Sequence, residues 1–206
     1  NGTVWTWGNA TQSLEWGSLG DGTTAISASP IQVLKGKDGD AISPVSNKYI
    51  ETIVDVTVGD SYANSAYAMF GALTEKGSLY IWGYDNVHPS GDSELSILTP
   101  IKSKFQTELK AISLGNAGAN DTQWLLGTGK DNQFYGGGYS AYGQAGTGVT
   151  ATAAIKRGLD SLGELIQTEA SIWSHVSGGI RSDGTVVMWG LNNYGQLGDI
   201  TVNSNP

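Results

Sequence analysis

The chain has 206 residues, enough for one large domain with a buried core, and carries a formal net charge of −8. An acidic chain repels the phosphates of nucleic acids, and no apolar run reaches the ~18 residues that a membrane helix needs. The absence of cysteine excludes disulfides, thiolate metal ligands and cysteine nucleophiles. The 30 glycines stand among seven Trp and nine Tyr, and this aromatic content favours a folded chain over a disordered one.

A short segment bounded by glycine recurs along the chain. Its copies occupy residues 2–8, 77–83, 132–138 and 184–190. Their closing glycines, at positions 8, 83, 138 and 190, are 75, 55 and 52 residues apart. Each copy is rich in apolar, aromatic or β-branched residues, which predicts a β-strand. Because both faces are apolar, each strand is expected in a small sheet that is covered on both sides, as in a β-propeller.

One face of the repeated strand carries large aromatic side chains, and these are expected in the core. They are Trp5, Trp7, Tyr80, Trp82 and Trp189. Further strands are predicted at residues 53–59 and 110–115, each ahead of a copy of the repeat. The stretch 159–170 is the only helix-like one, and it has few strong helix formers. A period near 50 residues with several short strands indicates a propeller rather than an α-solenoid.

A glycine-rich turn follows the repeated strand. It reads YGQLGD at residues 194–199, YGQAGT at 142–147 and WGSLGD at 16–21. A proline then recurs at Pro30, Pro100 and Pro206. These landmarks occur several times in the same order, which indicates a true internal repeat.

The clearest copy of the whole unit is DGTVVMWGLNNYGQLG, residues 183–198. This string resembles the repeat of the regulator of chromosome condensation family. The resemblance implies an all-β fold, a seven-bladed β-propeller with one repeat in each blade.

About four repeat motifs are present, so the single repeat domain 1–206 is expected to be an incomplete arc of the ring. The motifs lie near residues 1–30, 53–100, 109–154 and 172–206. The open blade edges of such an arc would be covered by the remainder of a longer parent chain or by a neighbouring subunit.

The sequence also departs from the family pattern. Met69, Trp124 and Val176 stand where the family usually has histidine, and Gly137 replaces the motif tryptophan. The first period contains about twenty extra residues, which are expected to form an insertion loop at about 36–48.

No catalytic, metal or cofactor site is predicted. Of the two histidines, His88 is expected in a loop, and His175 lies one residue from the family's histidine position. Two histidines without cysteine are a poor metal-ligand set. The chain contains 19 acidic residues but no feature that selects a pair, so a carboxylate-based glycosidase or lyase stays open as an alternative.

The function that fits best is non-enzymatic recognition by a repeat scaffold, with activity in the loops that connect the blades. Aromatic residues in or beside the turns are the candidate binding residues for a protein or glycan partner. They are Trp16, Tyr84, Tyr139, Tyr142 and Tyr194. The family resemblance also implies an alternative, guanine-nucleotide exchange on a small GTPase. The acidic, cysteine-free composition, rich in Thr, Asn and Gly, favours a bacterial protein that is secreted or held at the cell surface.

Overall fold

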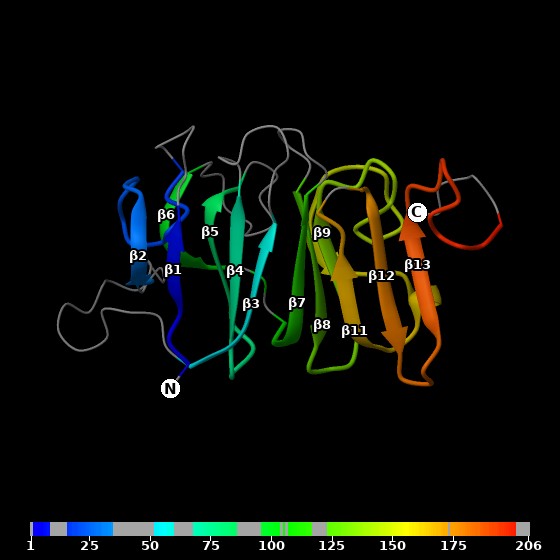
Figure 1. Cartoon of the computed structure of the whole chain (residues 1–206). Coiled ribbons are helices and arrows are strands. Elements are labelled where there is room, and N and C mark those ends of the chain that lie inside the picture. Colours follow the sequence, from blue (N-terminus) through cyan, green and yellow to red (C-terminus); the bar gives the residue numbers. More distant parts are fainter. Residues whose placement is uncertain are drawn as a thin grey trace.

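The computed structural model describes residues 2–8, 16–34, 52–59, 68–85, 96–103, 105, 107–116, 123–172 and 174–200. In these residues the chain forms four antiparallel sheets that stand side by side in chain order (Figure 1). The all-β expectation is therefore confirmed. The insertion at 36–48, His88 and Pro206 lie outside the described residues.

Each sheet is built from consecutive strands. The first sheet contains β1 (Trp5–Gly8) and β2 (Ser27–Gln32). The second contains β3 (Ile53–Gly59), β4 (Met69–Thr74), β5 (Leu79–Tyr84) and β6 (Ser96–Lys102). The third contains β7 (Leu109–Asn116), β8 (Gln123–Gly129), β9 (Phe134–Gly138) and β10 (Ala153–Arg157). The fourth contains β11 (Leu165–Ala170), β12 (Val176–Arg181) and β13 (Val186–Gly190).

The repeated segment forms the equivalent strand of every sheet, namely β1, β5, β9 and β13. The strands predicted at 53–59 and 110–115 are β3 and β7. The stretch 159–170 is a short 3-10 helix, Asp160–Leu162, followed by β11. Gly163 separates the two at a φ of 73°, a left-handed conformation that an α-helix does not contain. The completely buried Leu165 then anchors β11 in the core.

The aromatic face of the repeated strand points toward the preceding sheet. The indole Nε1 of Trp82 donates to the carbonyl oxygen of Ser18 at 3.1 Å, and that of Trp189 donates to the carbonyl oxygen of Gln144 at 2.9 Å. Both acceptors lie in the glycine-rich turn of the sheet before. A Cβ on Gly146 would lie only 2.9 Å from Nε1 of Trp189, so this turn requires glycine where the tryptophan docks.

The two end sheets each leave one face open. We expected Trp5 and Trp7 in the core, but they are 50% and 62% exposed, which corrects that expectation. They lie on the strand face opposite to Val4, which is buried together with residues of the second sheet. At the other end of the arc, Val186 and Met188 of β13 are exposed on the opposite face of the strand. They correspond to Leu79 and Ile81 of β5, which are buried between sheets. The exposure of Val186 and Met188 therefore marks a sheet face on which no described sheet packs.

Gly137, the residue in place of the motif tryptophan, has a local explanation. A Cβ at this position would lie 2.6 Å from the Cα of Ile155 on β10. The neighbouring strand therefore lies too close for any side chain at this position, which explains why the third sheet has glycine in place of the tryptophan.

Candidate functional site

Of the aromatic residues predicted for binding, Tyr84 is the last residue of β5, and the others follow a repeated strand, in loops at the upper edge of the sheets in Figure 1. Trp16 of the first sheet packs edge-on against Tyr84 of the second, with ring centroids 4.7 Å apart. Tyr84 is only 6% exposed, so it contributes to the junction between the sheets and has little surface left for a partner.

Three further aromatic rings form a cluster at the junction of the third and fourth sheets. Tyr142 packs edge-on against His175 at 4.7 Å, and Tyr139 lies 5.7 Å from the same imidazole. Trp124 stacks on the imidazole at 6.3 Å and donates its indole N–H to Ser177 Oγ at 3.0 Å. We call Tyr139, Tyr142 and His175 the rim cluster. Trp124 is fully buried and supports it from beneath.

The turn that carries Tyr142 is held in one conformation by its own hydrogen bonds. The backbone N–H of Tyr142 donates to Oε1 of Gln144 at 3.0 Å, and the N–H of Ala145 donates to Oγ of Ser140 at 3.3 Å. Tyr142 nevertheless keeps 37% of its surface exposed. The rim cluster thus presents a fixed aromatic surface to solvent.

His175 was not among the predicted binding residues, and the structure places it at the centre of the rim cluster. Its position next to Val176, the site of the family histidine, was the only sequence signal. Burial among aromatic rings lowers its pKa below the ordinary value of 6.5, because the charged imidazolium loses hydration there.

This pKa shift predicts a pH-dependent stability. Between the lowered pKa of folded His175 and the ordinary value near 6.5, the unfolded chain binds a proton that the folded chain does not. The free energy of unfolding should therefore fall as the pH is lowered from 7.5 to 5.5. Urea midpoints of the wild type and His175→Gln at both pH values measure this, and a midpoint difference between the two proteins that does not change with pH would contradict it.

Tyr194 belongs to the equivalent turn of the fourth sheet. Its backbone N–H donates to Oε1 of Gln196 at 2.8 Å, as Tyr142 does to Gln144. No described sheet follows, and Tyr194 is 93% exposed. The equivalent residues Trp16 and Tyr142 both pack on the next sheet, so the exposure of Tyr194 reflects the open end of the arc.

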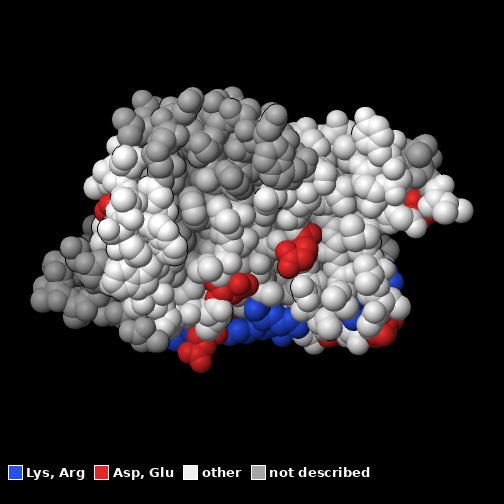
Figure 2. Space-filling model, in the orientation of Figure 1, with Lys and Arg blue, Asp and Glu red and all other residues white. Residues whose placement is uncertain are grey.

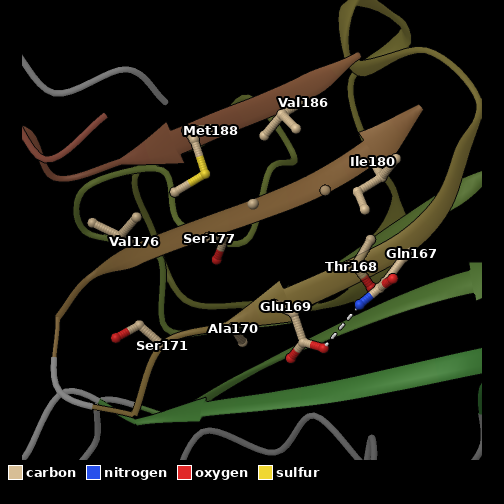
Figure 3. A pocket seen from close by; sticks show the side chains of 12 residues that line it. Gln167, Thr168, Glu169, Ala170, Ser171, Val176, Ser177, Ile180, Val186 and Met188 are labelled. Atoms are coloured by element: carbon tan, nitrogen blue, oxygen red, sulfur yellow. Dashed lines mark hydrogen bonds between the residues drawn. The ribbon is translucent and has the colours of Figure 1, made fainter. Parts of the chain in front are cut away.

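A hollow of about 330 Å³ lies on the open face of the fourth sheet (Figure 3). Met188 and Val186 of β13 border one side, Glu169 and Gln167 of β11 border the other, and β12 forms the floor. The floor includes Gly178, which carries no side chain of its own, so that the flexible Met188 side chain is the nearest group above it. We call this feature the end hollow.

The charged side chains of the described residues offer no metal-binding group. On the face of the molecule drawn in Figure 2, the acidic side chains form separate groups, and basic side chains lie along the lower edge. Among the described residues, no group of three His, Asp or Glu is placed to hold a metal ion. Within the same residues, no helix has the length and apolar character that crossing a membrane requires.

The sequence and the fold were both compared with those of known proteins. No family model matches the chain. It is 27% identical over 202 residues to the E3 ubiquitin-protein ligase HERC2 of Homo sapiens, covering 96% of this chain and 4% of HERC2. HERC2 of Mus musculus is likewise 27% identical, over 201 residues.

Solved structures with the same fold include human WBSCR16, with a TM-score of 0.67 at 16% identity, which matches 99% of this chain and 47% of that one. Prp20p from Saccharomyces cerevisiae gives a TM-score of 0.64 at 15% identity, over 99% of this chain and 45% of that one. The chain has the fold of the RCC1-type β-propellers. It spans less than half the length of these solved chains and a small part of HERC2.

Proposed function

We propose that the chain is a non-enzymatic protein-binding scaffold that contacts its partner through the rim cluster. The observation that carries this proposal is the exposure of Tyr142 on a turn that is fixed by hydrogen bonds and by His175. Tyrosine offers a large apolar ring together with a hydroxyl group, which suits a protein interface. Because the ring is already held in place, little conformational entropy is lost on binding.

The structural neighbours support a protein partner rather than a glycan. The solved structure of Prp20p is described together with its binding to Gsp1p and histones, and yeast RCC1 (Prp20) has been solved bound to Kap60. All of these named partners are proteins. An extracellular or cell-surface location stays a prediction from composition.

Guanine-nucleotide exchange is the second candidate, because a fold neighbour binds Gsp1p. The scaffold proposal expects this chain not to accelerate nucleotide release from Gsp1p. A fluorescent-nucleotide release assay with the full chain separates the two, since faster release would favour exchange activity over simple binding.

The scaffold proposal is tested by selecting peptides from a phage-displayed random library on the immobilised chain. Peptides that bind the rim cluster should lose about tenfold or more in affinity to Tyr142→Ala, as expected for truncation of an aromatic anchor. Ile166→Lys is the matched control, because Ile166 is an exposed apolar residue of β11 whose equivalent in β7 is Lys110. A selection in which no peptide loses affinity to Tyr142→Ala would contradict the proposed site.

A further inference from the structure

We infer that the end hollow binds an extended strand carrying two large aliphatic side chains two residues apart, of the kind that begins a sheet of this repeat. The inference rests on two copies of the same contact elsewhere in the chain. It does not depend on the rim cluster, which lies in other residues and is tested by other variants.

The first copy joins the second and third sheets. Ile112 and Leu114 of β7 pack over Gly71 of β4, and a Cβ on Gly71 would lie 3.4 Å from each of their Cδ1 atoms. The backbone N–H of Leu114 donates to Oγ1 of Thr57 on β3 at 3.0 Å. The next sheet therefore packs on a glycine of the middle strand and donates a backbone hydrogen bond to an oxygen acceptor on the first strand.

The second copy joins the third and fourth sheets, but here the large side chain is on the middle strand and the small side chains come from the next sheet. The backbone N–H of Ala170 on β11 donates to Oγ of Ser113 on β7 at 2.9 Å. The floor residue is now Leu126, a large side chain, and the small side chains Thr168 and Ala170 stand at the register positions of Ile112 and Leu114. A large residue on the middle strand thus faces small side chains from the next sheet, whereas a glycine there faces large ones.

The end hollow is the third position in this series. Gly178 pairs with Met188 as Gly71 pairs with Ile81, so its floor is of the glycine type. Glu169 stands at the register position of Thr57 and Ser113, the two acceptors. Among the described residues, its carboxylate receives two long contacts, from Gln167 Nε2 at 3.5 Å and Ser113 Oγ at 3.4 Å, and it has lone pairs for a further N–H donor.

The structure therefore assigns both the shape and the polarity of the occupant. Its aliphatic side chains lie over Gly178, against Met188 and Val186, and one of its backbone N–H groups donates to Glu169. A strand with small residues at the same two positions leaves the hollow unfilled, and the lost contacts weaken its binding.

The probe is a capped synthetic peptide with the sequence of residues 107–116, TELKAISLGN, added to the ¹⁵N- and methyl-labelled full chain. Saturable NMR shifts are expected at the amides of Gly178 and Gly179 and at the methyl group of Met188. A second peptide, with Ile112→Thr and Leu114→Ala to copy the pattern of β11, should bind at least fivefold more weakly. Glu169→Ala in the chain should weaken the first peptide about tenfold, and Ile166→Lys should leave it unchanged.

The decisive variant is Gly178→Leu, which gives the hollow the floor of the third sheet. Leucine is accepted at the equivalent position as Leu126, and the side chain nearest to it, Met188, is flexible. This variant should reverse the order of the two peptides. Equal binding of both peptides to the wild type, shifts confined to other residues, or no binding would overturn the inference. The titrations use the Trp7→Glu background, which leaves the end hollow unchanged. Shifts at Gly178 that depend on chain concentration without peptide in this background would also overturn the inference, by identifying a second copy as the occupant.

Discussion

Replacing Trp189 with alanine is expected to lower the free energy of unfolding by about 3–5 kcal/mol. The side chain is 2% exposed, donates to the carbonyl oxygen of Gln144, and packs edge-on against Phe134 with centroids 5.4 Å apart. Truncation leaves a cavity between two sheets and removes one of the two donors to the buried carbonyl of Gln144, which keeps only the Ser177 hydroxyl at 2.8 Å. Trp82→Ala should cost a similar amount, because Trp82 makes the same bond to Ser18 and stacks on Phe70. Urea or guanidinium denaturation measures both.

Trp7→Ala is the matched control for this prediction. Trp7 occupies the same position of the repeat but is 62% exposed, so its loss should change the free energy of unfolding by no more than about 0.5 kcal/mol at concentrations at which the chain is monomeric. An unchanged denaturation midpoint for Trp189→Ala, or an equal loss for Trp7→Ala, would show that the tryptophans do not join the sheets as described.

The full chain is expected to self-associate head to tail, with Trp7 of one copy entering the last turn of the next. Trp82 and Trp189 each dock on a turn whose glycine, Gly20 or Gly146, leaves room for the indole ring: a Cβ there would lie 3.0 Å or 2.9 Å from the indole Nε1. Among the described residues, no atom lies within 4 Å of a Cβ built on the equivalent Gly198, so the corresponding slot is open. Each copy thus carries an exposed tryptophan at one end and an empty slot at the other, together with exposed apolar side chains at both ends.

Multi-angle light scattering across a concentration series measures this association, and a matched pair of variants shows its direction. Trp7→Glu removes the inserting side chain, and Met188→Lys places a charge on the receiving face. Each variant alone should be mostly monomeric, while an equimolar mixture should form a one-to-one dimer, because each supplies the face that the other lacks. Ile166→Lys should associate like the wild type. A monodisperse wild-type monomer at all concentrations would contradict the prediction.

The repeat made much of the fold predictable. The strand between glycines, the turn after it and the burial of Trp82 and Trp189 follow from residues that recur in register. The middle strands β4, β8 and β12 were not predicted, because their glycines interrupt the alternation of apolar residues that marks a strand. The exposure of Trp7 could not be predicted either, since it depends on which neighbour lies next to the sheet and not on the local sequence.

The candidate site was predictable only in part. The turn aromatics were found from the repeat, but the role of His175 arises from contacts with Tyr142 and Tyr139 of another sheet. The end hollow depends on Gly178 meeting no large side chain from a following sheet. Such a feature is defined by packing between sheets, which no local pattern records.

Hydrogen exchange of the tryptophan indole N–H groups, followed by NMR in the Met188→Lys variant to prevent self-association, tests the stacked-sheet account most directly. Trp82, Trp124 and Trp189 each donate to an oxygen of a neighbouring sheet, so their indole protons should be strongly protected. Trp5 donates only to the exposed hydroxyl of Thr3 two residues away, and Trp7 is exposed, so the indole protons of both should exchange within the dead time of the experiment. Similar exchange rates for all five indoles would contradict the stacking of these sheets through their tryptophans.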